Sequence, residues 1–513
     1  MSKLFNNVQF YKPKKNKFDL SHERKMSMKM GTLTPFLVQE IIPGDSFRVN
    51  TEMLMRLQPL IAPMFHRVRV KTDYFFVPNR LVWDNWQNFI TGGDTGTDNP
   101  TPPYYQIGDA QKTAGFVEKG SLADYMGIPT FEKTDILTNI MNISALPFRA
   151  YQTIYNEYYR DQNIIPEINV PKTDGAQADL SNMNIRWRAW EKDYFTSALP
   201  WAQKGGAVEM PTDIQYKFPS QFVDANGNKI NSSVVSGKVE SNLGDLSVQS
   251  PAAGPMVPAT VDNIESLGTT INDLRVAVRL QEWLERNARA GSRYIESILS
   301  NFGVLSSDAR LQRPEYLGGG LVPIVISEVL STYQQSDDTG YPQGTMSGHG
   351  IATGGYGGFK RKFEEHGFVI GIMTVIPRTA YQQGIPKHYT RFDNMDYAWP
   401  SFAQLGEQAI KQSELYFDPT GANNDATFGY QSRYAEYKYQ PSTVHGDFRD
   451  NLAFWHMGRI FDAPPVLNEG FITADPTKRV FAVESQDEDE ILCQIYNRVD
   501  AIRPLPYFNT PTL

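Results

Sequence analysis

The sequence predicts a mainly β protein whose antiparallel strands are joined by long connections. Residues 67–76 alternate between polar and apolar side chains, which is the two-residue period of a β-strand. Residues 368–376 form a nearly continuous apolar run between a glycine and a proline, as is typical of a strand buried on both faces. More than half of the chain separates the two segments, so long connections must join the strands.

Composition sets the size and class of the protein. A chain of 513 residues exceeds what one simple core needs, so we expect two domains or one domain with large insertions. With 12% aromatic and only 21% charged residues, it is too apolar for disorder, and its 26 tyrosines suit contacts with many neighbours. A single cysteine excludes a disulfide framework within the chain and indicates folding in a reducing cytoplasm. The longest apolar run is too short for membrane insertion.

Residues 1–30 form a basic segment at the start of the chain. They contain eight lysines and arginines against two acidic residues, a net charge of +6, whereas the whole chain carries −8 and residues 31–513 therefore −14. A basic arm on an acidic body indicates an anionic partner for the arm alone. The alternative is a frayed and solvated terminus.

The first strand is predicted from Val68, because Val70, Tyr74 and Phe76 follow it at even spacing and Pro78 ends the pattern. A second strand is the apolar run described above. A third is predicted late in the chain, where two tyrosines flank Lys438. The fold class is therefore antiparallel β.

Two helices are predicted in the connections. Pro147 opens the first, and tyrosines at helical spacing continue it over residues 148–158. The second covers residues 271–299, with Thr270 as N-cap and glutamate–arginine pairs four residues apart. Gly291 lies near its middle and is expected to divide it.

Residues 205–265 differ in composition from the rest of the chain. They are rich in serine, asparagine, glycine and proline, and no strong apolar period runs through them. An Asn-Gly pair at their centre is a strong hairpin-turn signal. We expect a surface excursion. The glycine-dense residues 348–358 are likewise expected to form a flexible surface loop, because they lack the Lys-Ser/Thr ending of a phosphate-binding loop.

No residue pattern predicts an active site, a metal or a cofactor. The histidines never occur at ligand spacing on one helix, and no serine lies in a nucleophile-elbow motif. Some carboxylates must lie close together in any fold of this size. The residues therefore leave open a β-sandwich carbohydrate-active enzyme, or a glycan-binding module, as an alternative to a purely structural protein.

Long blocks across nearly the whole chain resemble the gokushovirus-type major capsid proteins of the Microviridae, which are small single-stranded DNA bacteriophages. The blocks occur in the order typical of that family, and residues 205–265 stand where its members carry a variable insertion. The longest blocks are PGDSFRVNTEMLMRLQPLIAPMF (43–65), DYFFVPNRLVWDNWQNFITGG (73–93), ALPFRAYQTIYNEYYRDQN (145–163), RYIESILSNFGVLSSDARLQRPEYLGG (293–319), EHGFVIGIMTVIPRTAYQQG (365–384) and FGYQSRYAEYKYQPSTVHGDFR (428–449).

The resemblance implies a structural, non-enzymatic protein with an eight-stranded antiparallel jelly roll and long inserted loops and helices over residues 31–513. It implies self-assembly into a T=1 icosahedral capsid around a circular single-stranded DNA genome. The protein would then be located in the virion, and in the bacterial host cytoplasm during assembly. No cofactor is implied.

The resemblance also implies roles for two segments. The arm would lie inside the shell and touch DNA without reading its sequence, through lysines interleaved with aromatic rings. The family has a small basic DNA-binding protein and other minor virion proteins as partners, so the arm would only assist that protein, or would bind a neighbouring subunit instead. The insertion, residues 205–265, would face a host cell-surface receptor. The candidate DNA-facing residues are Lys12, Lys14, Lys15, Lys17 and Lys25; the candidate host-recognition residues are Asp224, Asn226, Gly227 and Asn228.

Overall fold

The structure is a computed structural model that divides the chain into two compact units. One unit comprises residues 203–287 and the other residues 1–202 and 288–513. No helix in the described part of the chain is long and apolar enough to cross a bilayer. The described residues are 14–94, 97–132, 134–135, 137, 140–205, 222–223, 229–230, 232–235, 238–241, 271–290, 296, 299–300, 305, 307–332, 344–483, 485 and 487–508.

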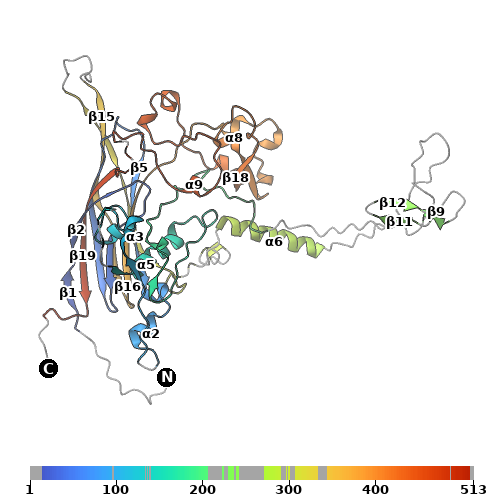
Figure 1. Ribbon diagram of the computed structural model, residues 1–513. Helices are drawn as coiled ribbons and strands as arrows, with labels where there is room; N and C mark the ends of the chain where they lie inside the picture. The colour runs from blue at the N-terminus through green and yellow to red at the C-terminus, as the bar shows by residue number, and fades with distance from the viewer. Residues whose placement is uncertain are drawn as a thin grey trace. The chain divides into compact units, whose positions relative to one another are not determined.

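Two antiparallel sheets dominate the larger unit (Figure 1). The six-stranded sheet has the order β1-β19-β4-β15-β14, with β2 also paired to β19, and the four-stranded sheet has the order β13-β5-β16-β3. The first sheet consists of β1 (Asn16–Asp19), β2 (His22–Met28), β4 (Ser46–Leu57), β14 (Val325–Leu330), β15 (Met346–Lys362) and β19 (Ile491–Arg503). The second consists of β3 (Thr34–Ile41), β5 (Val68–Pro78), β13 (Glu315–Pro323) and β16 (Gly367–Pro377).

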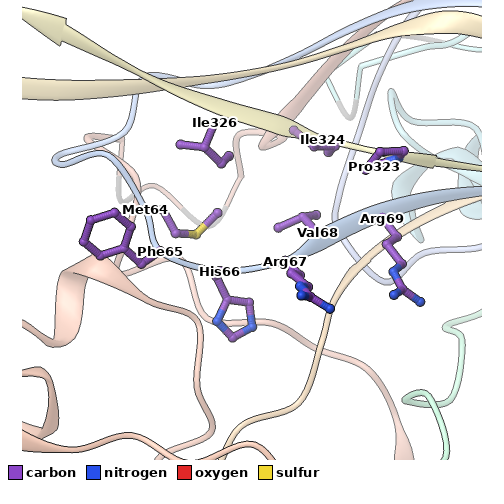
Figure 2. A pocket seen from close by; sticks show the side chains of 9 residues that line it. All are labelled: Met64, Phe65, His66, Arg67, Val68, Arg69, Pro323, Ile324 and Ile326. Atoms are coloured by element: carbon purple, nitrogen blue, oxygen red, sulfur yellow. The ribbon is translucent and has the colours of Figure 1, made fainter.

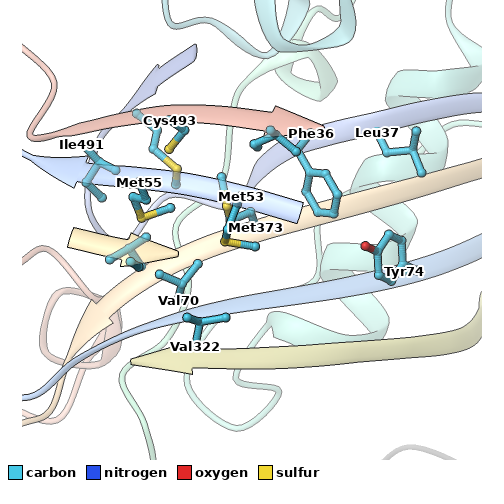
Figure 3. Packing of buried hydrophobic residues seen from close by; sticks show 14 of the residues in the cluster. Phe36, Leu37, Met53, Met55, Val70, Tyr74, Val322, Met373, Ile491 and Cys493 are labelled. Atoms are coloured by element: carbon cyan, nitrogen blue, oxygen red, sulfur yellow. The ribbon is translucent and has the colours of Figure 1, made fainter. Parts of the chain in front are cut away.

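A hydrophobic core lies between these two sheets (Figure 3). Alternate residues of β4 and β19 point into it, as their regular burial patterns show. The facing strands β5 and β16 supply Val70, Tyr74 and Met373, each fully buried. Burying apolar area at about 25 cal/mol per Å² makes this the main source of stability for the sandwich.

The second face of the four-stranded sheet is also covered, by helical elements inserted between β5 and β13. Phe75, Val77, Ile370 and Ile372 point away from the sandwich core into this second apolar cluster. The inserted elements are α1 (Asn79–Val82), α2 (Trp86–Thr91), β6 (Tyr104–Ile107), α3 (Asp109–Thr113), α4 (Leu122–Met126), β7 (Met141–Ser144), α5 (Leu146–Ile154), the π-helical turn η2 (Tyr155–Tyr159), β8 (Ala176–Gln177) and η3 (Ser181–Met183).

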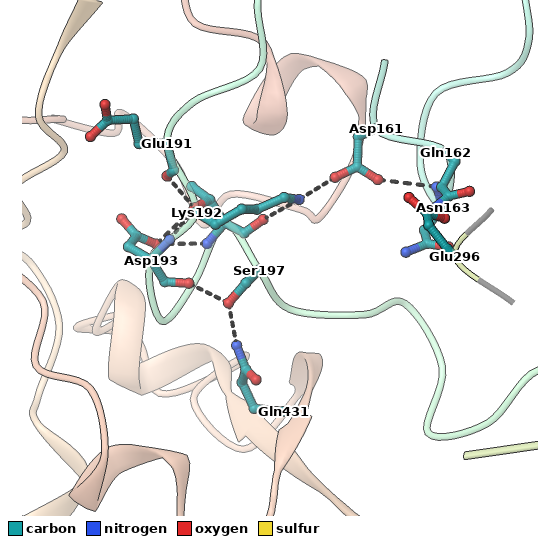
Figure 4. Close-up of polar contacts among 10 residues, drawn as sticks. Asp161, Gln162, Asn163, Glu191, Lys192, Asp193, Ser197, Glu296 and Gln431 are labelled. Carbon is teal, nitrogen blue, oxygen red and sulfur yellow. Dashed lines mark hydrogen bonds and ion pairs between the residues drawn. The ribbon is translucent and has the colours of Figure 1, made fainter. Parts of the chain in front are cut away.

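A third apolar cluster lies in the lobe between β16 and β19, and it also includes Ile165, Tyr194, Phe195 and Ala198 from earlier in the chain. Polar contacts join this earlier segment to the lobe: the Gln431 side-chain amide donates a hydrogen bond to the Ser197 hydroxyl (Figure 4), and Asp193 accepts one from the Tyr381 hydroxyl. The elements of the lobe are η4 (Lys387–Tyr389), η5 (Asn394–Asp396), η6 (Pro400–Phe402), β17 (Glu407–Lys411), α8 (Gln412–Leu415), β18 (Thr427–Ser432), η7 (Ala435–Tyr437), η8 (Gly446–Arg449), η9 (Ala453–Trp455) and α9 (Glu469–Ile472).

Several predicted elements are confirmed. The strand from Val68 is β5, and the apolar run of residues 368–376 is β16, buried on both faces as expected. The helix predicted over residues 148–158 begins at Leu146 and passes into η2. Helix α6 (Ile271–Ala290) ends directly before Gly291, while Thr270 lies outside the described residues.

Two predictions are wrong. Residues 348–358 are not a loop but the middle of β15, where glycines allow close approach of other backbone segments. A Cβ atom on Gly348 would lie 2.7 Å from the Ala62 carbonyl oxygen. Tyr437 is not in a strand but ends the turn η7, which begins after Tyr434 adopts a left-handed φ of 60°.

The predicted arm contributes to the sheet from Asn16 onward. Strands β1 and β2 both pair antiparallel with β19, although most of their polar residues are charged. Charged residues fit these strands because successive side chains of a strand point to opposite faces of the sheet. In β2, exposed residues such as Glu23 and Lys25 alternate with partly buried ones. This differs from an arm that is separate over all of residues 1–30.

Candidate nucleic-acid interface

The face of the six-stranded sheet that points away from the core is exposed to solvent. Residues that pair across the strands share one face of a sheet, so the strand registers define this surface. In β4, for example, Arg48 is opposite Asp500 of β19 and Lys360 of β15. We call the surface the outer sheet face. Its basic residues are Lys17, Lys25, Arg48, Arg56, Lys360, Lys362 and Arg498.

Acidic and apolar residues are interspersed among these basic ones. The seven basic residues outnumber the four acidic ones, so the face carries a net charge of +3 on a chain whose total is −8. The acidic residues are Asp19, Glu23, Glu52 and Asp500. Large apolar side chains on this face include Leu54, Leu492, Tyr496 and Ile502, exposed by 37–46%. Positive charge with an exposed tyrosine ring is a combination that binds single-stranded nucleic acid.

The charges of the outer sheet face interact weakly with one another. The Lys17 ammonium lies 2.7 Å from an Asp500 carboxylate oxygen, yet the lysine side chain is 64% exposed. Such surface ion pairs contribute about 1 kcal/mol or less. Hydrogen bonds from Ser21, aided by Lys17 and Arg498, lower the pKa of Asp19. Because its side chain is largely exposed, Lys17 remains accessible to a further anion.

The structure brings part of the predicted DNA-facing set together. Lys17 and Lys25 lie on the outer sheet face, in neighbouring strands that share β19 as partner. Lys14 is exposed, and the Lys15 ammonium donates a hydrogen bond to the Gly44 carbonyl oxygen beside the sheet. Lys12 lies outside the described residues.

An aromatic pair adjoins β1. The Phe18 ring stacks on Tyr507, with ring centroids 6.0 Å apart and planes inclined by 13°. Tyr507 is in turn 64% exposed, and the neighbouring Phe508 is 78% exposed. Phe18, one of the aromatic residues interleaved with the predicted lysines, thus lies near two aromatic residues from the far end of the chain.

Sequence reasoning missed the arginines of the outer sheet face. Arg48 and Arg56 belong to β4, where exposed and buried residues alternate without interruption. That alternation was a readable signal in residues 46–57. What could not be read was that β4 lies beside β19, which brings Arg498 from the other end of the chain opposite Asn50.

The four predicted host-recognition residues, Asp224, Asn226, Gly227 and Asn228, lie outside the described residues. The strands on either side of them, β9 (Phe222–Val223) and β10 (Lys229–Ile230), pair antiparallel. A second pair, β11 (Ser232–Val235) and β12 (Lys238–Ser241), follows. The pairing of β9 with β10 agrees with the hairpin expected from the Asn-Gly signal.

The described residues contain no group of three or more histidine, cysteine, aspartate or glutamate side chains that would hold a metal ion. Cys493 is buried in the sandwich core, and burial raises the pKa of its thiol to about 12. Because the thiolate is the reactive form of cysteine, this burial disfavours reaction at Cys493.

Comparisons with known proteins agree on one class of protein. The family described as "Capsid protein (F protein)" matches residues 6–513. The chain is 36% identical to capsid protein VP1 of Chlamydia phage 1, an alignment that covers 100% of this chain and 98% of the relative. It is 37% identical to capsid protein VP1 of Bdellovibrio phage phiMH2K, with 97% and 95% covered. Capsid protein VP1 of Spiroplasma virus 4 is 27% identical, again with 97% and 95% covered.

Proposed function

The chain belongs to the phage capsid protein (F protein) family, and from this premise we propose that it builds a T=1 icosahedral shell around a circular single-stranded DNA genome. It is a structural protein of the virion and not an enzyme. Identical copies assemble, in the host cytoplasm, with a small basic DNA-binding protein and other minor virion proteins. The single observation that carries the proposal is the family match along nearly the whole chain.

The shell domain is, we propose, an eight-stranded jelly roll. The strands β2, β3, β4, β5, β13, β15, β16 and β19, numbered one to eight in chain order, support this. One sheet then has the order 1-8-3-6 and the other 2-7-4-5. Each sheet alternates strands from the two halves of the chain, which is the arrangement that two interleaved Greek keys produce. Strands β1 and β14 extend the first sheet at its two edges.

The outer sheet face and the basic N-terminal segment face the genome in this proposal. Lysines and arginines neutralise phosphates and release counterions, while exposed rings stack on bases without distinguishing them. The face offers both, and the predicted lysines at positions 14, 15, 17 and 25 lie on it or near its edge. The contact is therefore expected to be strongly salt-dependent and independent of DNA sequence.

Neutralising the outer sheet face is expected to weaken the retention of DNA. In the variant Lys17→Gln, Lys25→Gln, Arg48→Gln and Arg498→Gln, the slope of log binding against log salt should fall by about 2 to 3, since each contact to single-stranded DNA contributes about 0.7. The measurement is the DNA content of purified particles, together with salt-dependent binding of single-stranded DNA by the chain.

A matched control removes the same charge elsewhere. Lys119, Arg310, Lys411 and Lys438 are exposed and lie outside the outer sheet face. Their replacement by glutamine should leave the slope unchanged. An equal loss of DNA in both variants would show that net charge matters and the outer sheet face does not.

Residues 205–265 recognise the host cell surface in this proposal. Paired short strands on either side of residues 224–228 support a hairpin, which is a suitable carrier for a recognition loop. Replacing Asp224, Asn226, Gly227 and Asn228 by alanine should reduce adsorption to host cells at least ten-fold. The particle yield should not change. Normal adsorption by intact particles of this variant would remove the proposed role.

A further inference from the structure

Strand β14 forms one edge of the six-stranded sheet in the part of the chain that the structure describes. Strand β14 pairs with β15 on one side, over the whole of Val325–Leu330. On its other side, the structure assigns it no strand partner among the described residues. An open edge presents a row of backbone N–H and C=O groups that can accept another strand.

Most of the exposed side chains of β14 are apolar. Val325, Val329 and Leu330 are 61%, 50% and 48% exposed. Natural sheets protect open edges with lysines, prolines or bulges, yet Glu328 is the only charged residue in β14. Such an edge is normally covered when the protein is assembled.

An apolar groove adjoins the start of β14 (Figure 2). It has a volume of about 570 Å³ and lies between the β13–β14 connection and the beginning of β5. Phe65 stands at its rim, with its side chain 69% exposed. The residues that line it include Met64, Val68, Ile324 and Ile326 on the apolar side and His66, Arg67 and Arg69 on the basic side.

The charges of this surface are opposite and unpaired in the described chain. Glu328 is exposed on β14, and Arg67 is exposed at the groove. Neither side chain makes an ion pair with another described residue, whereas Arg69 lies 3.9 Å from Glu191. A surface that carries one acid and one base in this way complements a second copy of itself about a two-fold axis.

We propose that a second copy of this chain covers the surface formed by β14 and the groove, with the β14 edges of the two copies facing each other antiparallel across a two-fold axis. The inference rests on the proposed shell, which requires identical chains to meet at two-fold axes. If the outer sheet face points to the genome, the edges of that sheet point sideways, toward neighbouring subunits. Apolar side chains, backbone hydrogen bonds and the Glu328–Arg67 pairing then hold the two copies together.

The first test places a charge on the edge. Val329→Lys should lower the yield of particles at least ten-fold, while the thermal unfolding midpoint of the unassembled chain stays within about 2 °C because the side chain is half-exposed. Ile140, which is 65% exposed and lies far from β14 in the chain, provides the matched control Ile140→Lys. Normal particle yield from the folded Val329→Lys chain would overturn the inference.

The second test uses the charge pair. Glu328→Arg and Arg67→Glu should each reduce the yield of particles several-fold, and the double variant should recover most of it. In addition, backbone amides of residues 325–330 should exchange hydrogen at least ten-fold more slowly in particles than in dissociated subunits. Equal exchange in both states, or no recovery in the double variant, would overturn the two-fold contact. If the unaltered chain formed no particles at all, the proposed shell itself would fail instead.

Discussion

Replacing Asp193 with alanine is expected to lower the free energy of unfolding by about 3 kcal/mol, because several hydrogen-bond donors share its carboxylate as their acceptor. One carboxylate oxygen accepts hydrogen bonds from the backbone N–H groups of Phe195 and Thr196, at 2.9 and 2.7 Å. The other accepts from the Tyr381 hydroxyl at 2.8 Å and from the Thr379 hydroxyl. These contacts join the segment before the insertion to the chain that leaves β16.

The loss of the Asp193 carboxylate also affects Tyr381, which is distant in the chain. Burial, together with the neighbouring carboxylate, raises the pKa of Tyr381 well above its usual range, so this hydroxyl stays protonated and needs an acceptor. Without Asp193 the hydroxyl and two N–H groups lose their acceptor. Urea unfolding of the unassembled chain measures the loss.

A surface aspartate supplies the comparison. Asp425 is 89% exposed and pairs with Lys411 at 2.8 Å, so Asp425→Ala should leave the free energy of unfolding nearly unchanged. Asp193→Asn keeps one acceptor oxygen and should fall between the two variants. A similar decrease in the free energy of unfolding in Asp193→Ala and Asp425→Ala would contradict the structural role of the hydrogen bonds to Asp193.

Replacing Gly358 with alanine is expected to destabilise the sandwich by about 2 to 4 kcal/mol. A Cβ atom there would lie 2.3 Å from the Val49 carbonyl oxygen and 2.5 Å from the Asn50 side-chain oxygen. Gly358 is opposite Asn50 where β15 pairs with β4, directly after a β-bulge. The methyl group would push β15 away from β4, which costs strain and ladder hydrogen bonds. Thermal unfolding and the yield of folded chain measure the effect.

Gly470 provides the matched control, since it lies in helix α9 and a Cβ atom there would meet only the Asn468 side-chain oxygen, at 3.5 Å. Gly470→Ala should be neutral or slightly stabilising, because alanine reduces the freedom of the unfolded chain. If Gly358→Ala unfolded at the same temperature as the unaltered chain, the close approach of β15 to β4 would not be a constraint.

Local sequence patterns correctly predicted the strands whose buried faces follow from the spacing of their apolar residues. The alternation around Val70 and the apolar run of β16 report burial on particular faces, and both strands form where expected. The glycines of β15 were misread, because a glycine signals flexibility or close packing and only the neighbouring backbone decides which. Tyr437 was misread because its ring lies against Arg391, at 4.3 Å, and not in a strand. Such contacts join residues that are far apart in the chain.

The sequence alone indicated a β-rich protein of the phage capsid family, because family motifs are properties of residue order. It also identified basic residues near the start of the chain. Only the tertiary structure decided that Lys17 and Lys25 join Arg48 and Arg498 on one exposed face, and that β14 is an uncovered edge. The physical reason is strand pairing, since β19, near the end of the chain, lies between strands from its start. The pairing of segments so far apart cannot be predicted from local composition.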